Sequence, residues 1–169
     1  MTGEEESSPF LFLASLRYMS NNFKILLVED NYEHLRLTRY IIKRQKVPGD
    51  VVVVRDGQEA LDYLYRRGNF ADPEASPRPD LVLLDLNIPR ISGKEVLSTI
   101  KSDEHLKAIP VIVVSSSDRD EDVKYAFEQG AVAYISKADG FEKLSQALAS
   151  IHTYASASKR EAGTHPPSS

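Results

Sequence analysis

The chain of 169 residues contains no cysteine, so neither disulfide bonds nor thiolate metal sites can form. It also lacks a block of basic residues and has a formal net charge of -4, unlike a nucleic-acid-binding surface. Long hydrophobic runs are missing as well. The apolar stretch over residues 10–16 is shorter than the roughly 18 residues that span a bilayer. Glu4, Glu5 and Glu6 precede it, where a signal peptide carries positive charge. We therefore expect a cytoplasmic protein that binds neither nucleic acid nor membranes.

The overall composition is that of an ordinary globular domain, with 41% hydrophobic and 27% charged residues. A chain of this length suggests one domain with extensions. We predict an N-terminal extension over residues 1–22, either an upstream-start segment or a small added segment. Residues 23–155 form the domain, and the polar residues 156–169 form a disordered tail.

Short runs of Val, Ile and Leu alternate with longer amphipathic stretches, which is typical of βα units around a parallel sheet. Most of the runs are continuously apolar, as in strands covered by helices on both faces. The pattern predicts an α/β fold with a doubly wound sheet. The predicted strands are residues 24–28, 51–54, 80–84, 110–114 and 132–135.

Helices are predicted between and after these strands. Leu35, Thr38 and Ile41 share one face of the first helix. Asp56 and Ser92 are candidate N-caps of the second and third. The fourth helix is expected over about residues 119–129, before Gly130, and the fifth begins near Gly140. Repeated prolines predict a loop over residues 70–79.

Acidic side chains follow two of the predicted strands. Asp85 ends the run over residues 81–84, and Glu29 and Asp30 end the run over residues 25–28. If these strands are parallel neighbours, the three acids meet at the carboxyl edge of the sheet, where such folds bind ligands. Like charges this close need a cation to offset them, and Mg²⁺ prefers such oxygen ligands. Ser115 and Lys137 follow the last two strands at the same edge.

This ordered set of five residues resembles the receiver domain of two-component response regulators, over about residues 23–155. The resemblance implies a flavodoxin-like (βα)5 fold with five parallel strands in the order 2-1-3-4-5. The local motifs that carry it are Leu27-Val28-Glu29-Asp30-Asn31, Asp56-Gly57-Gln58-Glu59-Ala60, Asp85-Leu86-Asn87-Ile88-Pro89 with Gly93, and Ile109-Pro110 leading to Ser115.

The resemblance also implies a role for each site residue. Asp85 would accept a phosphoryl group from a phosphohistidine on a partner kinase, so the chain would be a phosphoacceptor rather than an enzyme. Mg²⁺ would be held by Glu29, Asp30, Asp85 and the backbone carbonyl of Asn87. Lys137 and Ser115 would contact the phosphoryl group, and the small Ser116 would leave room for it. Ser115 and Tyr134 would form the conformational switch.

Each role has a plainer alternative. Asp85 could cap a loop, Glu29 and Asp30 could cap the first helix, and Ser115 could be a turn serine. Lys137 could be a solvated surface residue. A Tyr134 hydroxyl in water is the other open alternative. We expect His34, His105, His152 and His165 to be surface residues, because they show no metal-ligand spacing.

Two positions depart from the pattern of the family. Ala138 follows Lys137 where the family usually has a proline after a cis peptide bond. A non-proline cis bond costs about 2.5–4 kcal/mol, so this peptide is either trans with a shifted loop, or strained. Glu29 stands where aspartate is more frequent, and it reaches one methylene further.

The proline-rich loop and the phrase Leu84-Asp85-Leu86-Asn87-Ile88-Pro89 resemble the receivers that serve phytochrome-type histidine kinases. That resemblance implies a homodimer through the face of helix four, strand five and helix five. We also expect a stand-alone receiver, because no output domain follows the fifth predicted helix. The rival classes are a Mg²⁺-dependent phosphatase-like hydrolase and an interaction module that is not phosphorylated. A hydrolase commonly has Asp-x-Asp, but Asn87 occupies the second acid position here.

Overall fold

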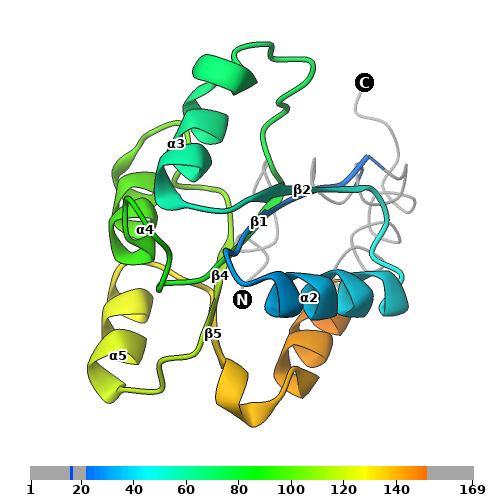
Figure 1. Ribbon diagram of the computed structural model, residues 1–169, viewed down its shortest axis with the longest axis vertical. Helices are drawn as coiled ribbons and strands as arrows, with labels where there is room; N and C mark the ends of the chain where they lie inside the picture. The colour runs from blue at the N-terminus through cyan, green and yellow to red at the C-terminus, as the bar shows by residue number, and fades with distance from the viewer. Residues whose placement is uncertain (1–15, 17–21, 152–169) are drawn as a thin grey trace, which may run out of the picture.

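The computed structural model describes residue 16 and residues 22–151, which include a five-stranded parallel sheet. The strand order β2-β1-β3-β4-β5 confirms the predicted fold class (Figure 1). Each predicted strand is present with bounds shifted by at most one residue. Ser115, expected just after the fourth strand, is its last residue. The strands are β1 (Lys24–Val28), β2 (Asp50–Val54), β3 (Leu81–Leu84), β4 (Val111–Ser115) and β5 (Ala133–Ser136).

The helices also agree with the periodicity of the sequence. The predicted caps are confirmed, because Asp56 Oδ1 accepts from the Glu59 N–H and Ser92 Oγ from the Glu95 N–H. The first helix is capped by Asn31, not by Glu29 or Asp30. The helical elements are α2 (Tyr32–Arg44), α3 (Gly57–Tyr65), η2 (Gly68–Phe70), α4 (Gly93–Ser102), α5 (Asp120–Glu128), η3 (Lys137–Asp139) and a final helix over residues 142–151.

The helices cover both faces of the sheet and divide the core in two. Helix α2 and the final helix lie on one face, and α3, α4 and α5 lie on the other (Figure 1). On the first face, Leu35 and Leu144 pack with strand residues such as Leu83. On the second, Leu64 and Leu97 belong to the other buried cluster. Burial on both faces explains why the strands are continuously apolar.

The proline-rich segment after η2 is a loop, as predicted, except that Phe70 is the last residue of η2. The Tyr63 hydroxyl donates to the carbonyl of Pro77 over 2.7 Å, and Arg66 Nε donates to the carbonyl of Ser76. These bonds fix the path of the chain into β3, the strand that carries Asp85 at its end.

The predictions for residues 1–21 and 152–169 lie outside the described residues, apart from residue 16. Among the described residues, no helix is both long and apolar enough to cross a bilayer.

Replacement of Gly93 by alanine should destabilise the fold, because the new Cβ would lie 2.3 Å from the Asp85 carbonyl oxygen and 2.4 Å from the Leu86 Cα. Overpacking of this kind costs about 1–3 kcal/mol, and urea unfolding followed by circular dichroism would measure it. Ser98→Ala in the middle of the same helix is the control, with an expected change within about 0.5 kcal/mol. Equal stability of the two variants would contradict the close packing of Gly93.

Candidate functional site

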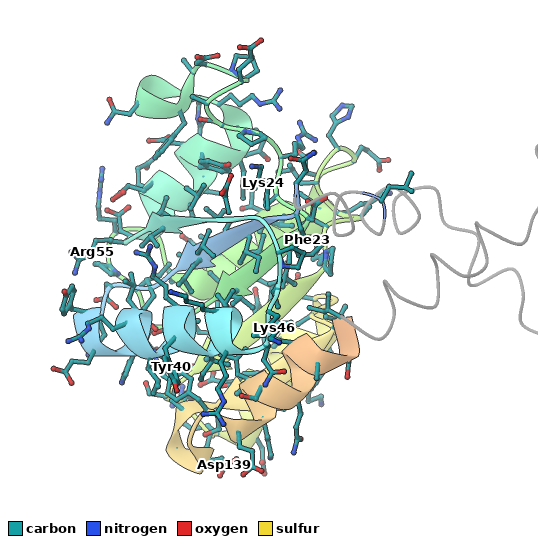
Figure 2. All side chains as sticks on the ribbon, turned by 90° about the vertical axis from the view of Figure 1, so that its right-hand side faces the viewer. Phe23, Lys24, Tyr40, Lys46, Arg55 and Asp139 are labelled. Atoms are coloured by element: carbon teal, nitrogen blue, oxygen red, sulfur yellow. The ribbon has the colours of Figure 1, made fainter. Side chains whose placement is uncertain are left out.

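The sheet places the two buried acids side by side. The Glu29 N–H donates to the Val54 carbonyl and the Asp85 N–H donates to the Val28 carbonyl, so the strand ladder continues past the apolar runs. Both side chains are buried, at 3% exposure for Glu29 and 5% for Asp85. Figure 2 shows Arg55 at this carboxyl edge of the sheet, with Phe23 and Lys24 at the opposite edge. Glu29 and Asp85 therefore meet at this edge, as predicted.

Lys137 joins these two acids. Its Nζ lies 2.6 Å from Glu29 Oε1 and 2.8 Å from Asp85 Oδ2, and its side chain is only 5% exposed. The alternative of a solvated surface lysine is therefore wrong. One ammonium group between two buried carboxylates offsets their mutual repulsion. The other Asp85 oxygen accepts the Asn87 N–H at 2.9 Å, so both oxygens of this carboxylate are oriented.

Three carboxylates form a cluster that suits a divalent cation. One oxygen from each of Glu29, Asp30 and Asp85 lies within 4.8 Å of the others. Burial raises the pKa of Glu29, an effect that Lys137 partly opposes. Such a buried carboxylate gains from a second positive charge nearby, and hard cations prefer all-oxygen ligands. Asp30 is exposed, so the cluster is open to solvent on that side.

The side chain of Asn87 connects the acids to the end of β4. Its Nδ2 lies 3.3 Å from Ser116 Oγ and 3.5 Å from Ser115 Oγ. Ser115 is fully buried, and its Oγ accepts the Ser117 N–H. Ser115 thus makes the bond of a turn serine and also faces the site. Ser116 is exposed beside it, as expected for a small neighbour.

The sequence did not predict a polar network centred on Ser117 and Asp122. The Tyr134 hydroxyl donates to the Ser117 carbonyl at 2.6 Å, so the alternative of a tyrosine hydroxyl in water is wrong. The Ser117 hydroxyl bonds to Asp122, which also pairs with Lys94 at 2.6 Å and Arg119 at 3.3 Å. The signal that could have predicted this network is the position of Asp122, an acid on the buried face of α5.

His34 is a second residue that sequence reasoning missed. Its side chain is 35% exposed, but its Nδ1 lies 2.9 Å from Lys137 Nζ, so the predicted surface histidine also contacts the site. His105 is exposed, as predicted, while residues 152 and 165 lie outside the described residues.

The peptide between Lys137 and Ala138 is trans, since the described residues contain no cis peptide bond. Lys137 instead begins the short helix η3, where Ser136 Oγ accepts the Ala138 N–H. Of the two expected possibilities, the trans peptide is the one observed. The trans loop still brings Lys137 to both acids.

A sheet of this order with two buried acids and a lysine at its carboxyl edge defines a receiver-type domain. The chain belongs to the response regulator receiver domain family, whose model matches residues 25–149. It is 36% identical over 130 residues to the response regulator Rcp1 of Synechocystis sp., covering 77% of this chain and 86% of that protein.

Two solved structures have the same fold. One is the phosphorylated cyanobacterial phytochrome response regulator RcpA, at 42% identity and a TM-score of 0.69, covering 79% of this chain and 93% of that one. The other is the Mn²⁺-bound form of Rcp1, at 36% identity and a TM-score of 0.68, covering 78% and 92%.

The Asp122 network should make stability depend on pH. Hydrogen bonds from Lys94 and Ser117 hold the pKa of Asp122 well below its ordinary value of 3.8. A depressed pKa stabilises the fold above the ordinary value, and this contribution is lost as the pH falls below about 4. Asp122→Asn should lower the free energy of unfolding at neutral pH and flatten its decline below about pH 4.

Urea titrations across this range would measure the effect. Glu128→Gln, at an exposed acid in the same helix, is the control and should keep the wild-type pH profile. A wild-type profile in Asp122→Asn would refute the assignment.

Proposed function

We propose that the chain is a phosphoacceptor response regulator in which Asp85 receives a phosphoryl group from a histidine kinase. The observation that carries this proposal is the pairing of Asp85 with Lys137 at 2.8 Å in a cluster of three acids. Membership of the receiver family and the phosphorylated state of the similar RcpA structure support it.

In the proposed transfer, an oxygen of Asp85 forms a bond to phosphorus while the bond between phosphorus and the imidazole nitrogen of the kinase breaks. The electron pair stays on that nitrogen, which takes up a proton. The product is an acyl phosphate. Such transfers depend mainly on positioning and on charge stabilisation at the phosphoryl oxygens. Lys137 supplies positive charge there, and the Ser115 hydroxyl supplies a hydrogen bond.

Mg²⁺ is the cation that we assign to the acidic cluster. Glu29, Asp30, Asp85 and the carbonyl of Asn87 would hold it, and the Mn²⁺-bound form of Rcp1 supports a divalent cation. When bound, it neutralises negative charge on the phosphoryl oxygens.

The output would be a change of conformation, with Ser115 and Tyr134 as its switch. Ser117 joins them, because its N–H bonds to Ser115 Oγ and its carbonyl accepts from the Tyr134 hydroxyl. A new negative charge on Asp85 that attracts Ser115 would therefore disturb the bond to Tyr134. A shift between two populations of the α5–β5 surface would follow.

We infer that the partner is a phytochrome-type histidine kinase, because the similar RcpA is a phytochrome response regulator. A homodimer through α5, β5 and the final helix fits the exposed Phe127 and Val132 beside β5. A turnover hydrolase is disfavoured, because Asn87 stands where a general acid would be needed and donates to Ser115 and Ser116.

Incubation with Mg²⁺ and acetyl phosphate should add one phosphoryl group to the wild-type chain. Asp85→Asn should abolish this addition, because an amide oxygen is not a nucleophile for phosphorus. Asp118→Asn, at an exposed acid in the loop after β4, is the control and should be labelled like the wild type. Intact-mass spectrometry would measure the gain, and continuous turnover of acetyl phosphate would favour the hydrolase.

Removal of Mg²⁺ with a chelator should stop the labelling. Asp30→Asn should weaken Mg²⁺ binding at least about tenfold, since even the outer partners of a metal site are worth that much. Isothermal titration calorimetry would measure the affinity. Glu33→Gln, at an exposed acid on α2, should bind Mg²⁺ as the wild type does. Unchanged affinity in Asp30→Asn would contradict the assigned ligand set.

A further inference from the structure

Lys137 has all three of its N–H donors engaged. A lysine ammonium has three donors and no acceptor. Two of them meet Glu29 Oε1 and Asp85 Oδ2, at 2.6 Å and 2.8 Å, and Nζ lies 2.9 Å from His34 Nδ1. Since the lysine ammonium has no acceptor lone pair, the histidine Nδ1 must be the acceptor. His34 therefore has its Nδ1 lone pair toward Lys137 and its proton on Nε2.

His34 is held through both its backbone and its ring. It comes from the first turn of α2, where its own N–H donates to the Asn31 side chain. The ring lies against Phe141, with centroids 6.2 Å apart and planes tilted by 48°. The turn that carries Asp139, between Lys137 and Phe141, lies alongside α2 (Figure 2). His34 thus contacts the residues at both ends of this turn.

The turn itself does little to aim the lysine. Lys137 starts a single turn of 3-10 helix with a trans peptide to Ala138, and Ala138 and Asp139 are exposed. A lysine side chain has four rotatable bonds, so a fixed backbone alone leaves the ammonium free to move. The two acids attract the ammonium, but a cation bound to the same carboxylates would compete with it. The third contact is to a neutral acceptor on α2 and involves neither acid.

We propose that His34 is a positioning residue that fixes the Lys137 ammonium for phosphoryl transfer to Asp85. This inference rests on the proposed function. His34 acts only through Lys137 and does not itself touch the phosphoryl group.

Two substitutions separate hydrogen bonding from packing. His34→Asn keeps an acceptor close to the position of Nδ1 but loses the ring. His34→Phe keeps a ring against Phe141 but has no acceptor. If His34 positions Lys137, the Phe variant should be phosphorylated by acetyl phosphate about tenfold more slowly, the value of one hydrogen bond to a charged group. The Asn variant should stay within about twofold of the wild type. A purely structural role predicts the reverse order.

Saturating Mg²⁺ is used throughout, with the Mg²⁺ affinity of each variant measured by calorimetry. The affinity should be unchanged, because Glu29, Asp30 and Asp85 are intact. As a second readout, the ¹⁵N NMR shift of His34 Nδ1 should move in Lys137→Met, since the donor is lost. An unmoved shift would overturn the contact.

The outcomes distinguish this inference from the function on which it rests. A wild-type chain that takes no phosphoryl group would refute the proposed function. A labelled wild type with a His34→Phe variant that reacts equally fast, or with His34→Asn as the slower variant, would refute only the role of His34.

Discussion

The ion pairs of Lys137 are the interaction on which the site depends. This buried ammonium holds together two buried carboxylates from different strands, Glu29 after β1 and Asp85 after β3. Without it, uncompensated negative charge would lie next to the core, a costly arrangement. Because Asp30 adds a third carboxylate, one lysine leaves the cluster with an excess of negative charge. This excess negative charge favours the binding of a divalent cation.

The same residues connect the site to the molecular surface through direct contacts. Asn87 bonds to Asp85 and approaches Ser115, whose hydroxyl accepts the N–H of Ser117. Ser117 then contacts Tyr134 and Asp122, on β5 and α5. A continuous set of polar contacts therefore connects Asp85 with β5 and α5. Coupling through this set requires a two-state element that both of its ends influence.

The sequence predicts most of the fold because its signals are local. Continuous apolar runs such as residues 81–84 mark strands, and Asp56 and Ser92 mark helix starts. The acids follow directly from their places after these strands. His34 escaped prediction because its partner Lys137 is 103 residues away. On a helix whose neighbours Arg36 and Arg39 are exposed, nothing local distinguishes a half-buried histidine from a surface one. The path of the Lys137 turn also depends on tertiary contacts.

We propose that Asp85 is the residue that carries the phosphoryl group. Borohydride reduces an acyl phosphate of aspartate to homoserine, which marks the modified position permanently. Phosphorylated chain should be reduced, digested and mapped by peptide mass spectrometry. Homoserine is expected at position 85 alone. Homoserine at Asp30 or another acid, with Asp85 unmodified, would contradict it.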